Sequence, residues 1–134
     1  MKLITRDTDY ALRALFYIAR HKERIVPASE LVRELKIPRP FLRKILQLLN
    51  KKGILKSHKG QGGGFLLEVS ANKIFLVDLI KIFQGPFHLN ECAFKKLICP
   101  NIKKCSLKEK MDRIERYVVS QLKCITVKSL LRQE

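Results

Sequence analysis

Hydrophobic positions in the first half of the chain follow a helical period in three separate segments. In residues 9–21 the apolar side chains recur every three or four positions, which predicts an amphipathic helix. A short second helix is expected at 28–35, before a turn that contains two prolines. A third helix is expected at about 40–52, because Pro40 suits a first helical turn and Gly53 is placed as a helix stop.

A hairpin pattern follows the third helix. Short strands are predicted at 54–58 and 65–69, with the glycine-rich sequence KGQGGG between them as the tip. A fourth helix is expected over 72–85, and a final one is expected to begin near Ser106 as its N-cap. The last helix is charged apart from one narrow apolar stripe, which steps by three and four: Leu107, Met111, Ile114, Val118, Leu122 and Ile125.

This order of elements predicts the fold class. Helix, short helix, turn, helix and glycine-tipped hairpin form a winged helix-turn-helix. We therefore predict a mainly α protein, with a two-stranded wing and a long C-terminal dimerisation helix. The expected divisions are a DNA-binding domain at 1–85, a cysteine-bearing loop at 86–105, and the dimerisation helix and tail at 106–134. A long charged helix with a narrow apolar stripe is typical of a helix that pairs with a copy of itself, so a homodimer is expected.

The charge of the chain indicates its partner. Lys and Arg number 28 against 12 Asp and Glu, a formal net charge of +16, and residues 35–67 hold eight cations and no acid. Such an excess favours nucleic acid. A membrane is not expected, because no apolar run approaches the roughly 20 residues of a spanning helix. Asp7 and Asp9 are unlike a secretory signal, so we expect a cytoplasmic protein.

Double-stranded DNA is the expected target. The third helix would enter the major groove, where Arg39, Arg43 and Lys44 could reach base edges. The wing would face phosphate or the minor groove through Lys56, Ser57, His58 and Lys59, and through glycines such as Gly62 and Gly63 that allow close backbone approach. A solvated basic face and an RNA-binding module are the alternatives. The RNA alternative is disfavoured because Phe65 is the only aromatic residue near the basic hairpin.

A second group of candidate functional residues consists of three cysteines, Cys92, Cys99 and Cys105. Their wide spacing differs from the C-x-x-C of zinc fingers and favours an iron–sulfur cluster, although structural zinc and free thiols remain alternatives. His88 could complete a site. Cys124, near the end of the last helix, is expected to be a small core residue. No catalytic arrangement is present, so an enzyme is not expected.

The whole chain resembles a known family. The resemblance is carried by TDYALRAL, the helix-turn-helix, SHKGQGGGFLLEVSANKIFLVDLI, the three-cysteine loop and ITVKSLL. It is to the Rrf-two family of bacterial transcription regulators, which includes the iron–sulfur cluster regulator IscR, the nitric-oxide-sensing repressor NsrR and the rhizobial iron regulator RirA. The resemblance implies a homodimeric repressor or activator that reads a palindromic operator and holds a 2Fe-2S or 4Fe-4S cluster.

The resemblance also implies a ligand set. Cys92, Cys99 and Cys105 would be the cluster ligands, and Asp9 from the partner subunit would be the fourth, with Asp7 a weaker candidate. Lys108 stands where the cluster regulators have a ligating histidine, and Lys36 stands where the family has a glycine. The implied signal is nitric oxide, redox state, or the supply of iron or clusters. A cluster-free regulator controlled by a partner protein and a zinc-stabilised nucleic-acid-binding module are the alternatives.

Overall fold

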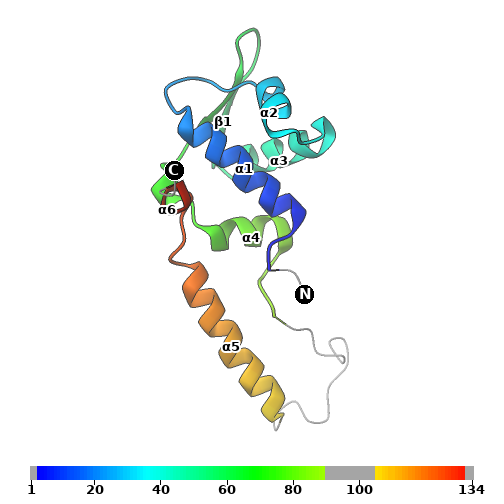
Figure 1. The fold of residues 1–134 in the computed structure, drawn as a ribbon, viewed down its shortest axis with the longest axis vertical. Coiled ribbons are helices and arrows are strands. Elements are labelled where there is room, and N and C mark those ends of the chain that lie inside the picture. The colour runs from blue at the N-terminus through cyan, green and yellow to red at the C-terminus, as the bar shows by residue number, and fades with distance from the viewer. Residues whose placement is uncertain (1–2, 90–104, 132–134) are drawn as a thin grey trace.

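The computed structural model describes residues 3–89 and 105–131, and Figure 1 shows how they are arranged. Three α-helices come first, followed by a two-stranded antiparallel hairpin, a short 3-10 helix and three further α-helices. In chain order the elements are α1 (Arg6–Arg20), α2 (Ala28–Leu35), α3 (Arg39–Lys51), β1 (Leu55–His58), β2 (Gly64–Leu67), η1 (Ala71–Lys73), α4 (Leu76–Gln84), α5 (Ser106–Leu122) and α6 (Val127–Leu130). This confirms the mainly helical winged helix-turn-helix.

The first helix is the centre of the core. Its fully buried apolar face consists of Ala11, Ala14, Leu15 and Ile18, and α2, α3, α4 and β2 pack around it. Thr5 caps the helix by accepting a hydrogen bond from the Thr8 amide. The Gln84 side-chain oxygen at the end of α4 accepts hydrogen bonds from the Thr5 amide at 3.0 Å and the Thr8 hydroxyl at 2.7 Å. The second bond gives the buried Thr8 hydroxyl a partner, and the two together join the start of α1 to the end of α4.

The helix-turn-helix agrees closely with the pattern. The second helix has the predicted bounds, and α3 begins one residue earlier than expected, after Pro38. Its buried face consists of Leu42, Ile45, Leu46 and Leu49, whereas the apolar Phe41 is exposed and Leu48 is half-buried. Between the helices Lys36 takes a left-handed conformation, with φ 55° and ψ 36°. This conformation is easy for the glycine of the resembled family and costly for lysine.

The hairpin is confirmed, with strands at Leu55–His58 and Gly64–Leu67 where 54–58 and 65–69 were expected. It also has an additional partner. Its register pairs Leu55 with Leu67 and His58 with Gly64. Phe65 also exchanges two backbone hydrogen bonds with Val26, at 3.0 and 2.8 Å, on the other side of β2. The wing is therefore attached to the segment that leads into α2.

The prediction of the fourth helix is wrong for its first turn. A single helix was expected over 72–85, but η1 is followed by extended backbone at Ile74 and Phe75 before α4 begins. The chain's C-terminal part explains the break: the Val127 amide donates to the Ile74 carbonyl and the Leu76 amide to the Ile125 carbonyl, both at 2.9 Å. This pairing with a distant segment replaces the helical hydrogen bonds that the local pattern favoured.

Within the described residues, the buried contact of the last long helix with the domain lies at its C-terminal end. Figure 1 shows α5 extending away from the other helices. Leu122 is buried with Leu76 and Ile80 of α4, whereas Leu107 and Ile114 are 65% and 50% exposed. The helix begins after Cys105, which is the N-cap in place of the expected Ser106, and it ends before Ile125. Beyond it α6 returns to the domain and buries Val127 in the main core.

Candidate nucleic-acid interface and cysteine region

The exposed face of α3 is cationic. Its exposed cations lie away from the buried leucines and isoleucine, and they are Arg39, Arg43, Lys44 and Lys51. The exposed side chains between and beside them are Pro40, Phe41, Gln47 and Asn50. Among the described residues none of these four cations is in an ion pair, as expected where no acid lies nearby in sequence. Cations without internal partners remain available to neutralise phosphates or to donate to base edges.

A groove joins this face to the wing. It has a volume of about 210 Å³ and is lined by Arg39, Arg43 and Gln47 of α3, by Ala28 and Val32 of α2, and by Phe65 of β2. The two arginines predicted to read bases therefore lie on the side of α3 that faces the hairpin. Lys44 lies on another side, beside Lys51 in a separate groove that Asp7 and Phe83 also line.

The predicted wing residues separate into two groups. Lys59 and Gly62 are exposed at the hairpin tip, whereas Ser57, His58 and Gly63 are half-buried. The His58 Nε2 atom is buried and has no hydrogen-bond partner among the described residues. A Cβ on Gly63 would lie 2.1 Å from the His58 carbonyl oxygen, so this glycine permits close approach to the chain's own backbone.

A polar cluster that the sequence analysis missed joins α1 to α2. Arg24 donates two hydrogen bonds to the Glu30 carboxylate, at 2.9 and 2.6 Å, and the Tyr17 hydroxyl donates one at 2.5 Å. The bonds from Arg24 and then Tyr17 lower the pKa of Glu30 to about 2. The same carboxylate raises the pKa of Tyr17. Residues 13 positions apart gave no sequence signal for this cluster.

The cysteine region is described only at Cys105, since Cys92 and Cys99 lie outside the described residues. Cys105 is half-buried, and its Sγ accepts a hydrogen bond of 3.4 Å from the Lys108 amide. The Lys108 side chain pairs with Asp112 at 2.6 Å. Within 3–89 and 105–131 no group of three or more potential ligands is assembled. Cys124 was expected in the core, but it is exposed in the turn between α5 and α6, and its Sγ donates to the Ser120 carbonyl.

The predicted fourth ligand lies on α1. Asp9 is half-exposed in the first turn and pairs with Arg13, with 2.9 Å between its Oδ2 and Nε. Figure 1 shows α1 within the domain and the first turn of α5, which Cys105 caps, at the far end of the protruding helix. One chain therefore does not bring Asp9 and Cys105 together. His88, the other candidate, lies beside α5 with its Nδ1 2.9 Å from Glu115 Oε1.

The described helices include none that is long and apolar enough to cross a membrane.

Together, the helix-turn-helix, the hairpin beside it and the exposed cationic face define a winged-helix DNA-binding transcription regulator. The sequence model of the Rrf2 family, whose description is Iron-dependent Transcriptional regulator, matches residues 4–133. The chain belongs to this family. Family members and relatives are transcriptional regulators and not enzymes, in agreement with the expectation from the sequence.

Individual relatives agree with this assignment. A protein of Aquifex aeolicus (strain VF5) named as an HTH-type transcriptional regulator is 33% identical over 135 residues, which cover 98% of this chain and 94% of the relative. Among solved structures, CymR, the global cysteine regulator of B. subtilis, has a TM-score of 0.84 at 21% identity, covering 100% of this chain and 99% of CymR. T. potens IscR has a TM-score of 0.76 at 21% identity, covering 98% and 87%. These structures are similar to the chain in fold.

Proposed function

We propose that two copies of this chain bind a palindromic operator and that an iron–sulfur cluster controls the binding. The observation that carries the DNA-binding part is the groove in which Arg39 and Arg43 of α3 lie beside Phe65 of the wing. In this arrangement α3 enters the major groove while the hairpin lies along the adjacent backbone. Arginine is suited to bidentate contact with guanine, which supplies sequence readout.

The other predicted contacts have positioning roles. Lys44 donates to phosphate from the same helix, and Lys59 does so from the exposed wing tip beside Gly62. Ser57, His58 and Gly63 are less exposed, so they act mainly by shaping the hairpin that presents Lys59. Loss of Lys59 should therefore weaken binding to all duplexes, whereas loss of Arg43 should relax sequence preference.

The homodimer is supported by the unpartnered part of α5. Leu107, Ile114 and Tyr117 are 65%, 50% and 66% exposed on a helix that leaves the domain. Leu107 and Ile114 are one heptad apart, which is the spacing of residues that meet a second helix. Pairing of two such helices removes this apolar surface from water. It also sets the two α3 helices at the separation of two half-sites, about 34–36 Å.

The described part of the cysteine region fits a cluster ligand. At the start of α5 the backbone amides favour negative charge, and the backbone amide of Lys108 already donates one hydrogen bond to Cys105 Sγ. The Lys108 side chain is occupied by Asp112, which leaves the fourth position to another residue. Cys92, Cys99 and Cys105, with Asp9 of the partner subunit, would hold the cluster, whose redox and nitric-oxide reactivity would supply the signal.

Control of binding follows from the position of Asp9. A carboxylate engaged by the partner's cysteine loop would leave Arg13 and hold the first turn of α1 in place. That turn contains Arg6, which lies against Phe41 at the start of α3. Release of Asp9 would therefore change the contact between Arg6 and Phe41 that holds the start of the recognition helix in each subunit. Because two half-sites must be met at once, a small displacement lowers operator affinity.

The DNA-binding proposal is tested by comparing Arg43→Ala with wild type on the selected operator and on random duplex. We expect operator affinity to fall about 10–100-fold, the loss of one bidentate contact, and random-duplex affinity to change much less. Lys110→Ala, which removes an exposed cation from α5, is the matched control and should leave both affinities close to wild type. Equal losses on both duplexes with Arg43→Ala would contradict base readout.

The cluster proposal needs a separate test. Protein purified without oxygen should contain iron and acid-labile sulfide in matched amounts and absorb visible light, and Cys105→Ser should reduce all three. Colourless protein with zinc would support the zinc-stabilised form. Colourless protein without metal would support a cluster-free regulator controlled by a partner protein. Either colourless result would contradict the cluster while leaving DNA binding intact.

A further inference from the structure

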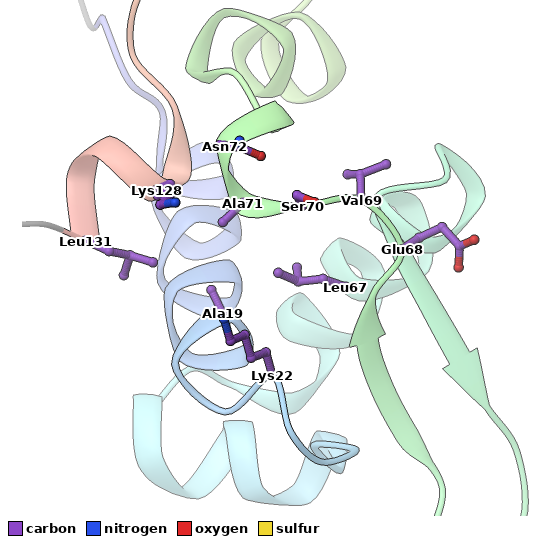
Figure 2. Close-up of a pocket in the computed structure, with 10 residues that line it drawn as sticks. All are labelled: Ala19, Lys22, Leu67, Glu68, Val69, Ser70, Ala71, Asn72, Lys128 and Leu131. Carbon is purple, nitrogen blue, oxygen red and sulfur yellow. The ribbon is translucent and has the colours of Figure 1, made fainter.

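A cleft larger than the groove beside the wing lies away from the recognition helix. Its volume is about 670 Å³, within the range of roughly 300–1,000 Å³ typical of small-molecule sites. Figure 2 shows that its walls come from the end of α1, the segment from the end of β2 into η1, and α6. No residue of α2 or α3 lines it. The cleft thus lies where the returning C-terminal part of the chain meets the DNA-binding domain.

The floor of the cleft is apolar. Ala19, Leu67, Ala71 and Leu131 line it, and all four are half-buried side chains packed against the main core. In Figure 2 the Leu67 and Ala71 side chains extend toward α1, so α1 and the segment after β2 enclose the floor from two sides. A surface of this kind is suited to a hydrocarbon group of a ligand.

The rim of the cleft is polar and cationic. Lys22 follows α1 and Lys128 belongs to α6, and within the described part of the chain neither is in an ion pair. Ser70 and Asn72 add a hydroxyl and an amide whose side chains make no hydrogen bond to any described residue. Glu68, the one acid among the lining residues, is directed away from the other lining side chains in Figure 2. The rim therefore favours one negatively charged group.

We propose that this cleft binds a small amphipathic carboxylate, with its anionic group between Lys22 and Lys128 and its hydrocarbon part on Ala71 and its apolar neighbours. A ligand placed there contacts α1, η1 and α6 together. It would therefore stabilise the attachment of α6 to the domain, which at present depends on Val127 and on the backbone pairing near Ile74. This site is separate from the DNA-binding face and uses none of the proposed cluster ligands.

The experiment is a titration of the ¹⁵N-labelled full chain with hexanoate, followed by NMR. We expect saturable shifts of the amides of Ala71, Asn72 and Lys128, and a higher unfolding temperature with hexanoate present. Hexylamine, with the same chain length and the opposite charge, should not shift these amides. Saturation by hexylamine at the same concentration would contradict an anion site, and shifts that rise linearly without saturation would contradict a site of any kind.

Variants distinguish binding in the cleft from the non-specific attraction of anions to a basic protein. Lys22→Ala/Lys128→Ala should weaken hexanoate binding about tenfold or more, because charge-assisted hydrogen bonds are lost. Lys110→Ala/Lys123→Ala removes the same charge from α5 and the residue that follows it, and should leave the affinity unchanged. Ala71→Leu, which fills the floor without changing charge, should also abolish binding. Equal losses in both double variants, or equal shifts with inorganic phosphate, would overturn the proposal. No DNA or cluster is present in this assay, so its result is independent of the function proposed above.

Discussion

The guanidinium of Arg6 lies over the ring of Phe41, 4.6 Å from the ring centroid. Arg6 is the first residue of α1, and Phe41 is in the first turn of α3, so the contact joins the start of the central helix to the start of the recognition helix. Phe41 is 39% exposed, so the contact lies at the surface and not in the core. The pair is a direct contact between the turn that carries Asp9 and the helix that would read DNA.

The first prediction concerns this pair. A cation over an aromatic ring at a partly exposed site contributes about 0.5–1 kcal/mol. In a double-mutant cycle, Arg6→Ala and Phe41→Leu should show a coupling of that size in the free energy of unfolding, measured in urea. Arg6→Lys should retain part of it. Additive effects of the two substitutions would show that the contact contributes nothing to stability.

The second prediction concerns pH and Glu30. Its pKa in the folded chain is lowered to about 2 from an ordinary value of 4.5, so the stabilisation is present above pH 4.5 and is lost as the pH falls toward 2. Between pH 6 and 2.5 the urea midpoint of the wild type should fall more steeply than that of Glu30→Gln. Glu109→Gln, at an exposed pair with Arg113, is the control and should keep the wild-type slope. Parallel curves for all three proteins would exclude a role for the Arg24–Glu30–Tyr17 cluster in acid stability.

The third prediction concerns Lys36. A left-handed lysine costs roughly 1–2 kcal/mol, and glycine in its place costs about 0.5–1 kcal/mol in unfolded-state entropy. Lys36→Gly should therefore raise the free energy of unfolding by roughly 0.5–1 kcal/mol in chemical denaturation. Lys36→Ala keeps both the left-handed conformation and a Cβ, so its stability should stay close to that of wild type. A gain of the same size in Lys36→Ala would assign the effect to charge and not to backbone strain.

The fourth prediction concerns the attachment of the wing. A Cβ on Gly64 would lie 2.3 Å from the Val26 carbonyl oxygen and 2.8 Å from Pro27 Cα, both of them backbone atoms. Gly64→Ala should disrupt the Val26–Phe65 pairing and cost about 2–4 kcal/mol in thermal unfolding. Gly53→Ala, where a Cβ meets nothing within 4 Å but φ is +78°, should cost only about 1–2 kcal/mol. A smaller loss at Gly64 than at Gly53 would mean that the wing can move away from Val26 at little cost.

The fifth prediction concerns the proposed fourth ligand. Asp9→Ala should fold and dimerise like wild type but should release iron faster to a chelator under anaerobic conditions, because one ligand of each cluster is lost. Asp7→Ala, an exposed acid two residues earlier, is the matched control and should release iron at the wild-type rate. If the two variants exchange these behaviours, Asp7 is the ligand; if neither differs from wild type, the fourth ligand is another group, with His88 the next candidate.

Local sequence signals were sufficient to predict the helices and the hairpin of the DNA-binding half of the molecule. The prolines around 27–40 and the glycines around 53–64 restrict the backbone within a few residues, and the 3.6-residue period specifies which face of each helix is buried. These effects act over one or two turns of chain, so α2, α3 and the hairpin could be predicted from the sequence. The exposed cations of α3 followed as well, because a side chain opposite the buried face of a helix points to solvent.

The features that could not be predicted depend on contacts between segments that are distant in sequence. Residues 74–75 fit a helical pattern, yet their pairing with 125–127 makes them extended, because backbone hydrogen bonds from a distant segment satisfy the same groups as a helix would. The Arg24–Glu30–Tyr17 cluster, the exposure of Cys124 and the cleft below α6 likewise depend on which elements meet. The sequence by itself therefore determined the local elements and their charge. Only the tertiary structure decided where the C-terminal part of the chain packs, because that packing depends on surfaces formed by residues far apart in the chain.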